Sequence, residues 1–472
     1  MKQLFTLVVG IALNQLGLFH FVRTALAVLL VSVGVLAAAE VTSQFPPQLL
    51  AFSAAKEQQA RQLAKELKLD LSPDIWRFFA AAKQGDWPTA TNVYAQLRLR
   101  AGQYQDSTND VAVAGPVWQT IIEVEMPFEA FATGGKKYPL AIGEGIIQSI
   151  PAGSIYFGGT DHGRGLVTAL CASQPEGKPF YTLTQNALAD ERYLDYLRAM
   201  YGRRIYIPTT EDSQKAFQDY TADVQRRREQ NQLKPGEEVK MSEGRVQVCG
   251  QVAVMNINGM LAKTIFDHNT NCEFYVEESF PLEWMYPYLS PHELIFQLNR
   301  EPLPRLTETM LDADRAFWVK KCGAMLGGWL KPETGVSKVC AFAEKVYGRK
   351  DYSHFTGDRE FVTNDYAMKA FSKLRSSQAG LYQWRLTNKP GVDQARLRAA
   401  ADYAFRQAFA LCPTSPEAVY RYVNFLLSEN RLDDAIQLAQ TARKLAPDSE
   451  QYDTVLKQLK NFQEQQKMKA AH

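Results

Sequence analysis

GGTDHGRG, residues 158–165, joins a short β-prone run at 154–157 to an apolar helical run at 166–172. A strand, a glycine-rich turn and a helix start together point backbone N–H groups at an anion or a polar ligand. The turn also supplies functional side chains from Thr160, Asp161, His162 and Arg164. We therefore expect it to face a ligand or an interface, with the rest of the chain organised around it.

The residues on either side of this turn predict an α/β domain at 117–306. Strand-like runs occupy 120–124, 154–157, 180–183, 204–207, 245–248 and 273–276. Helix-like runs occupy 166–172, 190–201, 212–229, 257–267 and 291–298. Short apolar strands alternating with amphipathic helices favour a mostly parallel, doubly wound sheet. Asn256 is well placed to cap the helix that begins at Ile257, and Gly202 to end a helix directly before a strand.

In an open sheet of this kind, ligands bind beyond the carboxyl ends of the strands. Polar groups follow four of the predicted strands, at 160–164, 184–186, 209–211 and 277–279. The candidate ligand-binding residues are Gly158, Gly159, Thr160, Asp161, His162, Arg164, Asn186, Glu277 and Glu278.

Two of these groups suggest chemistry. Asp161 and His162 could form an acid/base pair or bind a cation, and Arg164 could hold a carboxylate, a phosphate or a sugar hydroxyl. The alternative is that these are ordinary polar loop residues, with Asp161, Thr184 and Asp190 capping helices.

No established catalytic motif accompanies the turn. It is neither a Walker loop nor a clean Gly-x-Gly-x-x-Gly fingerprint, and the chain has no Gly-x-Ser-x-Gly elbow. His268, His292 and His354 have no partners at metal-ligand spacing. We therefore predict no cofactor and no metal site, and we assign no catalytic residue. Asp312-Ala313-Asp314 resembles the Asp-x-Asp of sugar-nucleotide enzymes, but its helical surroundings favour a solvated helix face.

The N-terminal residues 1–39 predict the compartment. An apolar run at 25–39 follows Arg23 and ends in Ala37-Ala38-Ala39, which is typical of a cleaved signal peptide. The longer segment 4–39 could instead be retained as a membrane anchor. Either way we expect the remainder outside the cytoplasm, periplasmic or anchored to the membrane.

Charge and cysteine content add two expectations. Lysine plus arginine, 53 residues, nearly balances aspartate plus glutamate, 51 residues, so nucleic acid is not an expected partner. The cysteines are scattered without a Cys-x-x-Cys motif. Cys322 and Cys340 could pair if their helices are antiparallel, and buried free thiols are the alternative.

Helical segments flank the α/β part, at 40–110 and 307–472. In the first, Gln84-Gly85-Asp86-Trp87 followed by Ala90 resembles the hinge of a tetratricopeptide hairpin. In the second, Ala401, Phe405, Ala408 and Pro413 recur 34 residues later as Ala435, Ala439, Ala442 and Pro447.

This period and spacing resemble the tetratricopeptide family over about 365–448. One step further back gives Ala367, Phe371 and Leu374, with Ala379 where proline is expected. Asn388-Lys389-Pro390-Gly391 interrupts the first helix of the middle repeat, and 451–466 has the pattern of a capping helix. The resemblance implies a groove that binds a protein or peptide partner, although so short an array could instead brace the α/β domain.

A second resemblance covers about 158–303. It is carried by Ile257-Asn-Gly-Met-Leu-Ala-Lys-Thr-Ile-Phe266, by Phe274-Tyr-Val-Glu-Glu278 and by Tyr286-Pro-Tyr-Leu289, together with Thr184-Gln-Asn-Ala-Leu188. These segments are similar to the soluble part of bacterial GT-C-type multi-pass membrane proteins related to O-mannosyltransferases. The multi-span region of that family is absent here, so no catalytic residue carries over.

Two hypotheses of function follow. The first is an exported or membrane-anchored tetratricopeptide scaffold, without catalytic activity, whose α/β domain binds a ligand or an interaction partner. The second is an accessory, sugar-binding or transferase component of envelope glycosylation, acting on a glycan or sugar phosphate at the Gly158–Gly165 turn. Whether the side chains at the predicted strand ends converge on one site discriminates the two.

Overall fold

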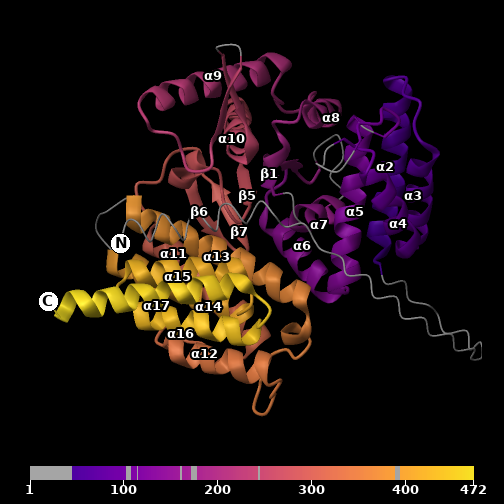
Figure 1. The fold of residues 1–472 in the computed structure, drawn as a ribbon. Helices are drawn as coiled ribbons and strands as arrows, with labels where there is room; N and C mark the ends of the chain where they lie inside the picture. The colour runs from indigo at the N-terminus through magenta and orange to yellow at the C-terminus, as the bar shows by residue number, and fades with distance from the viewer. Residues whose placement is uncertain are drawn as a thin grey trace, which may run out of the picture.

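A computed structural model describes residues 45–102, 108–113, 115–159, 162–171, 178–242, 245–388 and 394–471. It is 67% helical and contains a small mixed sheet. Figure 1 shows this sheet between the α9–α10 region and the C-terminal helices, with the N-terminal helices to one side. The predicted signal or anchor, 1–39, lies outside the described residues. No helix within the described ranges is both long and apolar enough to cross a bilayer.

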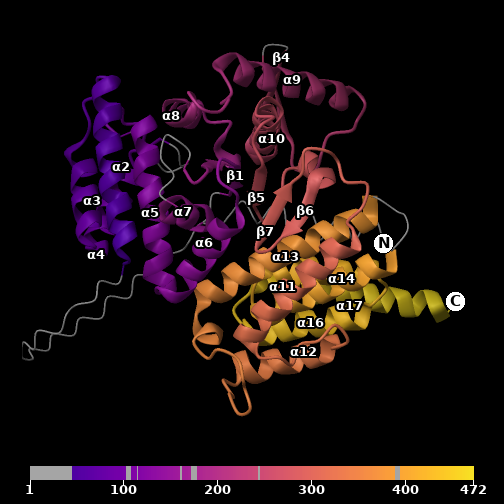
Figure 2. The same cartoon turned by 180° about the vertical axis from the view of Figure 1, so that it is seen from behind.

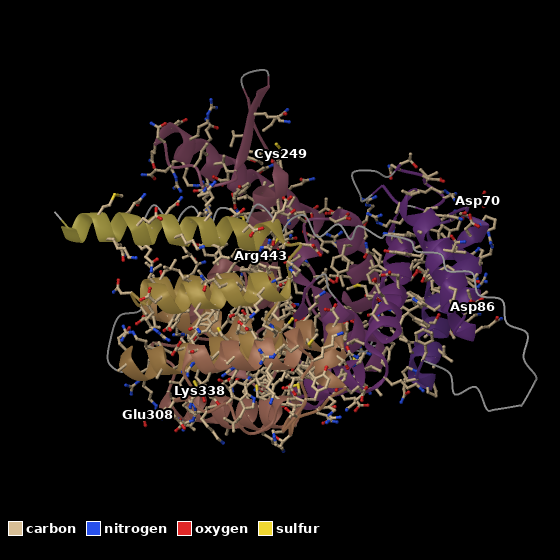
Figure 3. All side chains as sticks on the ribbon, turned by 60° about the horizontal axis from the view of Figure 1, so that its bottom comes forward. Asp70, Asp86, Cys249, Glu308, Lys338 and Arg443 are labelled. Atoms are coloured by element: carbon tan, nitrogen blue, oxygen red, sulfur yellow. The ribbon has the colours of Figure 1, made fainter. Side chains whose placement is uncertain are left out.

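The N-terminal part is helical: α2 (Pro47–Glu66), α3 (Pro73–Gln84), α4 (Trp87–Arg98), α5 (Pro116–Gly134) and α6 (Lys137–Ser149). The expected α3–α4 hairpin is present. Gly85 ends α3 with a φ of 73°, in the left-handed region that favours glycine. Asp86, labelled in Figure 3, caps α4 by accepting a hydrogen bond from Thr89 N at 3.3 Å.

The middle of the chain alternates strands and helices up to α10. The elements are β1 (Ile155–Gly158), α7 (His162–Leu170), β2 (Tyr181–Thr184), the 3₁₀ turn η1 (Gln185–Ala187), α8 (Glu191–Tyr201), α9 (Thr210–Glu229), β3 (Glu238–Ser242), β4 (Arg245–Cys249) and α10 (Gly250–His268). They are followed by β5 (Phe274–Glu277), the 3₁₀ helix η2 (Glu283–Tyr288), β6 (Leu289–His292) and β7 (Ile295–Leu298).

Within the described residues, the main sheet has the strand order β2-β1-β5-β7-β6. β1 pairs in parallel with β2 and β5, whereas β7 is antiparallel to both β5 and β6. The doubly wound sheet is therefore not confirmed. A parallel core of β2, β1 and β5 is extended by an antiparallel hairpin.

Three predicted elements were wrong, and a fourth forms the expected strand but lies outside the main sheet. Residues 120–124 lie in α5, which begins at Pro116 directly after Gly115, and 204–207 form no strand. Residues 245–248 form β4, which pairs only with β3 in a separate hairpin that carries Cys249 (Figure 3). Residues 291–298, expected to be helical, form most of the β6–β7 hairpin, whose turn places Glu293 at a φ of 49°.

Two capping predictions are also revised. α10 begins at Gly250, so Asn256 lies inside the helix, where its Nδ2 donates to Val252 O at 2.7 Å. Gly202 does end α8, but with a φ of −60° and with no strand directly after it. Its role does not depend on a positive φ.

The C-terminal part begins with α11 (Glu308–Leu326), α12 (Val336–Ala343), the π turn η3 (Glu344–Gly348) and the 3₁₀ turn η4 (Phe361–Thr363). It continues with α13 (Asp365–Asn388), α14 (Gln394–Leu411), α15 (Pro416–Ser428), α16 (Leu432–Leu445) and α17 (Glu450–Ala471). The two later sets of repeat positions, which begin at Ala401 and Ala435, are confirmed. Phe405 on α14 and Ala439 on α16 are both fully buried. The earliest set is wrong, because α13 is unbroken through Ala379. Of the predicted interruption at 388–391, Asn388 is the last residue of α13 and the other three lie outside the described residues.

A buried polar network joins α11 and α13. Arg375 Nη1 lies 3.0 and 2.8 Å from the two Asp314 oxygens, and Tyr382 OH donates to Asp314 at 2.7 Å. Gln378 Oε1 accepts from Trp318 Nε1 at 2.6 Å and from Arg375 at 3.0 Å. We call these five residues the Asp314 network. Asp314 is only 6% exposed, so the expected solvated helix face holds for Asp312 but not for Asp314.

One connected cluster of buried apolar residues runs through the described chain from Phe45 to Leu459. All six cysteines are free, including the buried Cys322 and Cys340, so the disulfide considered for that pair is absent. Burial raises the pKa of the Cys322 thiol to about 12 and that of Cys340 to about 11, which makes both poor nucleophiles.

Candidate functional site

The strand register brings two of the predicted polar groups, 184–186 and 277–279, to one edge of the sheet beside the start of the glycine-rich turn. Gly158 at the end of β1 lies opposite Thr184 at the end of β2 and Glu277 at the end of β5. The segments 158–159, 184–186 and 277–278 are therefore neighbours, as expected from parallel strands. We call Thr184, Gln185, Asn186, Glu277 and Glu278 the strand-edge cluster.

Glu278 is held by its neighbours on both sides. Its Oε2 accepts from Asn186 Nδ2 at 2.9 Å, and its Oε1 accepts from Ser279 N at 2.7 Å. Gly159 lies directly against this carboxylate, because a Cβ at that position would be only 2.5 Å from Glu278 Oε2. A side chain at position 159 would therefore require the Glu278 carboxylate to move.

Glu277 is 2% exposed and is paired with a residue from the C-terminal helices. Lys373 Nζ, on α13, lies 3.0 Å from Glu277 Oε1. Burial, together with the neighbouring Glu278 and Glu417, raises the pKa of Glu277 to about 8 despite this ammonium group. Burial likewise raises the pKa of Glu278 to about 7, and it lowers the pKa of Lys373 to about 8.

Further residues of α13 and α15 close over the same edge. Ser377 Oγ donates to Glu278 O at 2.6 Å, and Arg421 donates to Ser279 O while its guanidinium lies 4.1 Å from the Phe280 ring centroid. Arg421 also lies 3.4 Å from Glu417. Figure 2 shows α13 next to β7, and Gln378 Nε2 donates to Ile295 O there at 3.1 Å. None of these helical residues could be recognised as part of the site from the sequence, because they lie 83 to 142 positions away from the residues they contact at the sheet.

Several buried polar atoms of the strand-edge cluster have no hydrogen-bond partner. Gln185 is 0% exposed, yet neither its Nε2 nor its Oε1 is hydrogen-bonded. Thr184 Oγ1 and Asn186 Oδ1 are also buried and have no hydrogen-bond partner among the described residues. A buried polar group without a partner typically costs about 1–3 kcal/mol. The cluster therefore offers both donors and acceptors to an incoming polar ligand.

The remaining predicted residues are distributed as follows. Thr160 and Asp161 lie outside the described residues, as do the side chains of His162 and Arg164, although α7 does begin at His162. The 209–211 group is not at this edge: Thr209 forms a capping box with Asp212 at the start of α9. Gly165 is a packing residue, because a Cβ there would be 2.6 Å from Met126 Cβ on α5.

His268 and His292 interact with neighbouring protein groups. A ring nitrogen of His268 lies 2.9 Å from Thr264 O, and one of His292 lies 2.8 Å from Ser149 O. His268 also stacks on Tyr206 with a centroid distance of 4.1 Å. In the described part of the chain, no three histidine, cysteine, aspartate or glutamate residues are grouped so that they could hold a metal ion.

Comparison with known proteins identifies one segment. The family model for the tetratricopeptide repeat matches residues 394–459, which run from α14 into α17. No curated protein and no solved structure matches the chain. The match supports a helical tetratricopeptide-like region of the kind that generally mediates protein–protein interaction. It does not confirm the GT-C-type resemblance of the α/β part.

Proposed function

We propose that this chain is an exported or membrane-anchored scaffold that binds a protein or peptide and catalyses no reaction itself. The proposal starts from its tetratricopeptide segment. The support is the stacking of α14 to α17 within the matched residues, since stacked hairpins offer an extended binding surface. The export part of the proposal rests on the apolar run at 25–39 and its Ala-x-Ala end.

One observation carries the partner proposal. Tyr420 OH and Asn424 Oδ1 on α15, and Gln458 Oε1 on α17, are buried and have no hydrogen-bond partner. The rings of Tyr420 and Tyr452 lie 6.4 Å apart, which brings the two helices together at this point. Unpartnered acceptors beside aromatic rings suit the backbone N–H groups and side chains of a peptide.

The face of α13 and α15 toward the sheet is already occupied. Arg385 on α13 donates to the carbonyl oxygens of Leu303, Pro287 and Leu289 at 2.9, 3.0 and 3.2 Å. Trp384 stacks on Tyr286 with a centroid distance of 5.2 Å. We therefore assign partner binding to α15 and α17 and not to α13.

The test is selection of a displayed random-peptide library on the full chain. We expect enriched peptides to bind the wild type and to lose about tenfold or more in affinity on the Asn424→Leu/Gln458→Leu variant. Gln440→Leu, at an exposed position on α16, is the matched control and should bind as the wild type does. Failure to enrich any peptide, or equal affinity for all three proteins, would overturn the partner proposal.

The strand-edge cluster supports a second candidate, recognition of a glycan or sugar phosphate. Its observation is the set of unsatisfied donors and acceptors on Thr184, Gln185 and Asn186, which matches the many hydroxyl groups of a sugar. A thermal-shift screen of the full chain against sugars, sugar nucleotides and inorganic phosphate tests it. A shift seen in the wild type and absent in Gln185→Leu would support the candidate, and no shift with any of these ligands would eliminate it.

A further inference from the structure

A second cavity lies away from the strand edge, between α9, α10 and the start of η2. Its volume is about 600 Å³, within the range of about 300–1,000 Å³ that is usual for small-molecule sites. α10 contributes Met255, Asn256, Gly259, Met260, Lys263 and Thr264. These positions share one helix face, while Asn258, Leu261 and Ile265 on another face are buried in the core.

The floor of the cavity is apolar and aromatic. Met255, Met260, Leu282 and Trp284 contribute its apolar lining. The Trp284 indole is fixed by Phe266 and Tyr288, at centroid distances of 5.4 and 6.1 Å. Methionine side chains are flexible and polarisable, and they pack well against aromatic rings. Such a floor suits a flat aromatic molecule.

Gly259 keeps this space open. A Cβ at position 259 would lie 3.8 Å from Leu282 Cδ2 and 3.9 Å from Trp284 Cδ1, which are ordinary contact distances. A larger side chain could therefore be accepted by the backbone, and it would project into the cavity. Glycine inside a helix is less favourable than alanine by about 1 kcal/mol, so the open space has an energetic cost.

One polar atom in the floor has no partner. Trp284 Nε1 is buried and is not hydrogen-bonded. It is bonded to Cδ1, which lies 3.9 Å from the Cβ position of Gly259, so Nε1 is close to the α10 wall of the cavity. A buried indole N–H normally finds an acceptor, and a ligand atom in the cavity can supply one.

The charged residues around the rim are already neutralised. Lys215 pairs with Asp219 at 2.5 Å, Lys263 with Asp267 at 2.5 Å, and Glu283 with Lys234 at 3.5 Å. Asp212 accepts from Thr209 N at 2.9 Å and from Tyr206 OH. We therefore do not expect the cavity to select a charged ligand.

We propose that this cavity binds a small, flat, uncharged aromatic molecule that presents a hydrogen-bond acceptor to Trp284 Nε1. The site is separate from the strand-edge cluster and from the α15–α17 surface. It does not depend on either function proposed above.

The test uses Prodan, a neutral naphthalene ketone whose emission shifts to the blue in apolar surroundings, titrated into the full chain. The blank matches any detergent in the protein sample. We expect saturable binding to the wild type and affinity about tenfold or more lower for Gly259→Leu, whose side chain fills the cavity. Gly323→Leu is the matched control, because that glycine lies on α11 with nothing within 4 Å of its Cβ position.

A second variant tests the contribution of the hydrogen bond separately from that of the apolar contacts in the cavity. Trp284→Phe keeps an aromatic floor but removes the N–H, so Prodan affinity should fall by about three- to tenfold, the equivalent of one hydrogen bond. The dimethylaminonaphthalene that lacks the ketone should bind both proteins alike. The proposal is overturned by non-saturable binding, by equal loss in the two leucine variants, or by loss of both probes to the same extent in Trp284→Phe.

Discussion

Gln185 and Gln378 are both completely buried, but their amide groups have opposite surroundings. Gln378 donates to Glu293 O and Ile295 O and accepts from Trp318 and Arg375, all at 2.6–3.1 Å. Within the described residues, neither atom of the Gln185 amide makes a side-chain hydrogen bond. The Asp314 network and the strand-edge cluster differ in the same way. In the Asp314 network, both Asp314 oxygens accept hydrogen bonds, whereas the strand-edge cluster contains buried polar atoms without a partner among the described residues.

The comparison distinguishes two uses of buried polarity. A buried network whose groups are paired fixes the relative positions of helices, and it needs nothing from outside. A buried group without a partner lowers stability, and in a native protein it calls for an explanation such as a ligand. We therefore assign a structural role to the Asp314 network, and the strand-edge cluster remains the proposed binding site.

The largest expected effect is in the Asp314 network. Asp314→Ala leaves the Arg375 guanidinium, itself 1% exposed, without its counter-charge. Loss of one partner from a buried ion pair typically costs about 3–5 kcal/mol. Urea unfolding followed by circular dichroism measures the change. Asp312→Ala, at a carboxylate that is 46% exposed, should cost less than about 1 kcal/mol, and similar losses in the two variants would contradict the distinction.

The next effect tests the paired glutamine. Gln378→Leu removes the donor to two sheet carbonyls and the acceptor of Trp318 Nε1, so we expect a loss of about 2–4 kcal/mol in the free energy of unfolding. Gln→Leu changes little in side-chain volume, so the change reports mainly on hydrogen bonding. A loss below about 1 kcal/mol would show that these bonds do not stabilise the junction.

A pH effect of intermediate size is expected from the strand-edge carboxyls. Their pKa values of about 8 for Glu277 and about 7 for Glu278 lie above the ordinary value of 4.5. Between those values the folded protein retains protons that the unfolded chain releases, so the contribution of these groups is complete below pH 4.5 and is lost as the pH rises toward 8.

The measurement is the free energy of unfolding of the wild type and of Glu277→Gln/Glu278→Gln from pH 5 to 7.5. Glutamine does not ionise, so the variant should gain steadily in stability relative to the wild type as the pH rises across this range. A constant difference between the two proteins would contradict the raised pKa values.

The smallest expected change in the free energy of unfolding is at Gln185, and its sign is opposite to that at Gln378. Gln185→Leu removes an amide that has no partner, so we expect unchanged stability or a gain of up to about 1 kcal/mol without ligand. Thermal unfolding of Gln185→Leu beside Gln378→Leu makes a direct comparison of two equally buried glutamines. A loss at position 185 as large as that at position 378 would remove the basis for a ligand at the strand edge.

The parts of the fold that depend on local pattern could be predicted. The α3–α4 hairpin follows from Gly85 and Asp86, and the α14 and α16 positions follow from their 34-residue period. β1, β2 and β5 were placed within one residue, because each is a short apolar run bounded by turn residues.

The β6–β7 hairpin was missed for a physical reason. Pro291, Leu294, Ile295 and Leu298 have the i, i+3, i+4, i+7 spacing of a helix. Its turn uses Glu293 in a left-handed conformation instead of the glycine or asparagine that would have signalled it.

The candidate site was only partly predictable. Gly158, Gly159, Asn186, Glu277 and Glu278 could be grouped because parallel strands end at one edge of the sheet. Lys373, Ser377 and Arg421 could not, because their place depends on how α13 and α15 pack on the sheet. Asp314 was misjudged for the same reason, since the partners that bury it are on α13.

Helix α13 also limits how this array of helices can change in length. One side of it binds the sheet through Gln378 and Arg385, and another binds α14 through Ser372 Oγ, which donates to Ala408 O at 2.8 Å. A hairpin inserted before α14 would separate these two sets of contacts. The last turns of α17, by contrast, are exposed, with Met468 at 59%. New repeats can therefore be added after α17, by evolution or by design, without separating the two sets of α13 contacts.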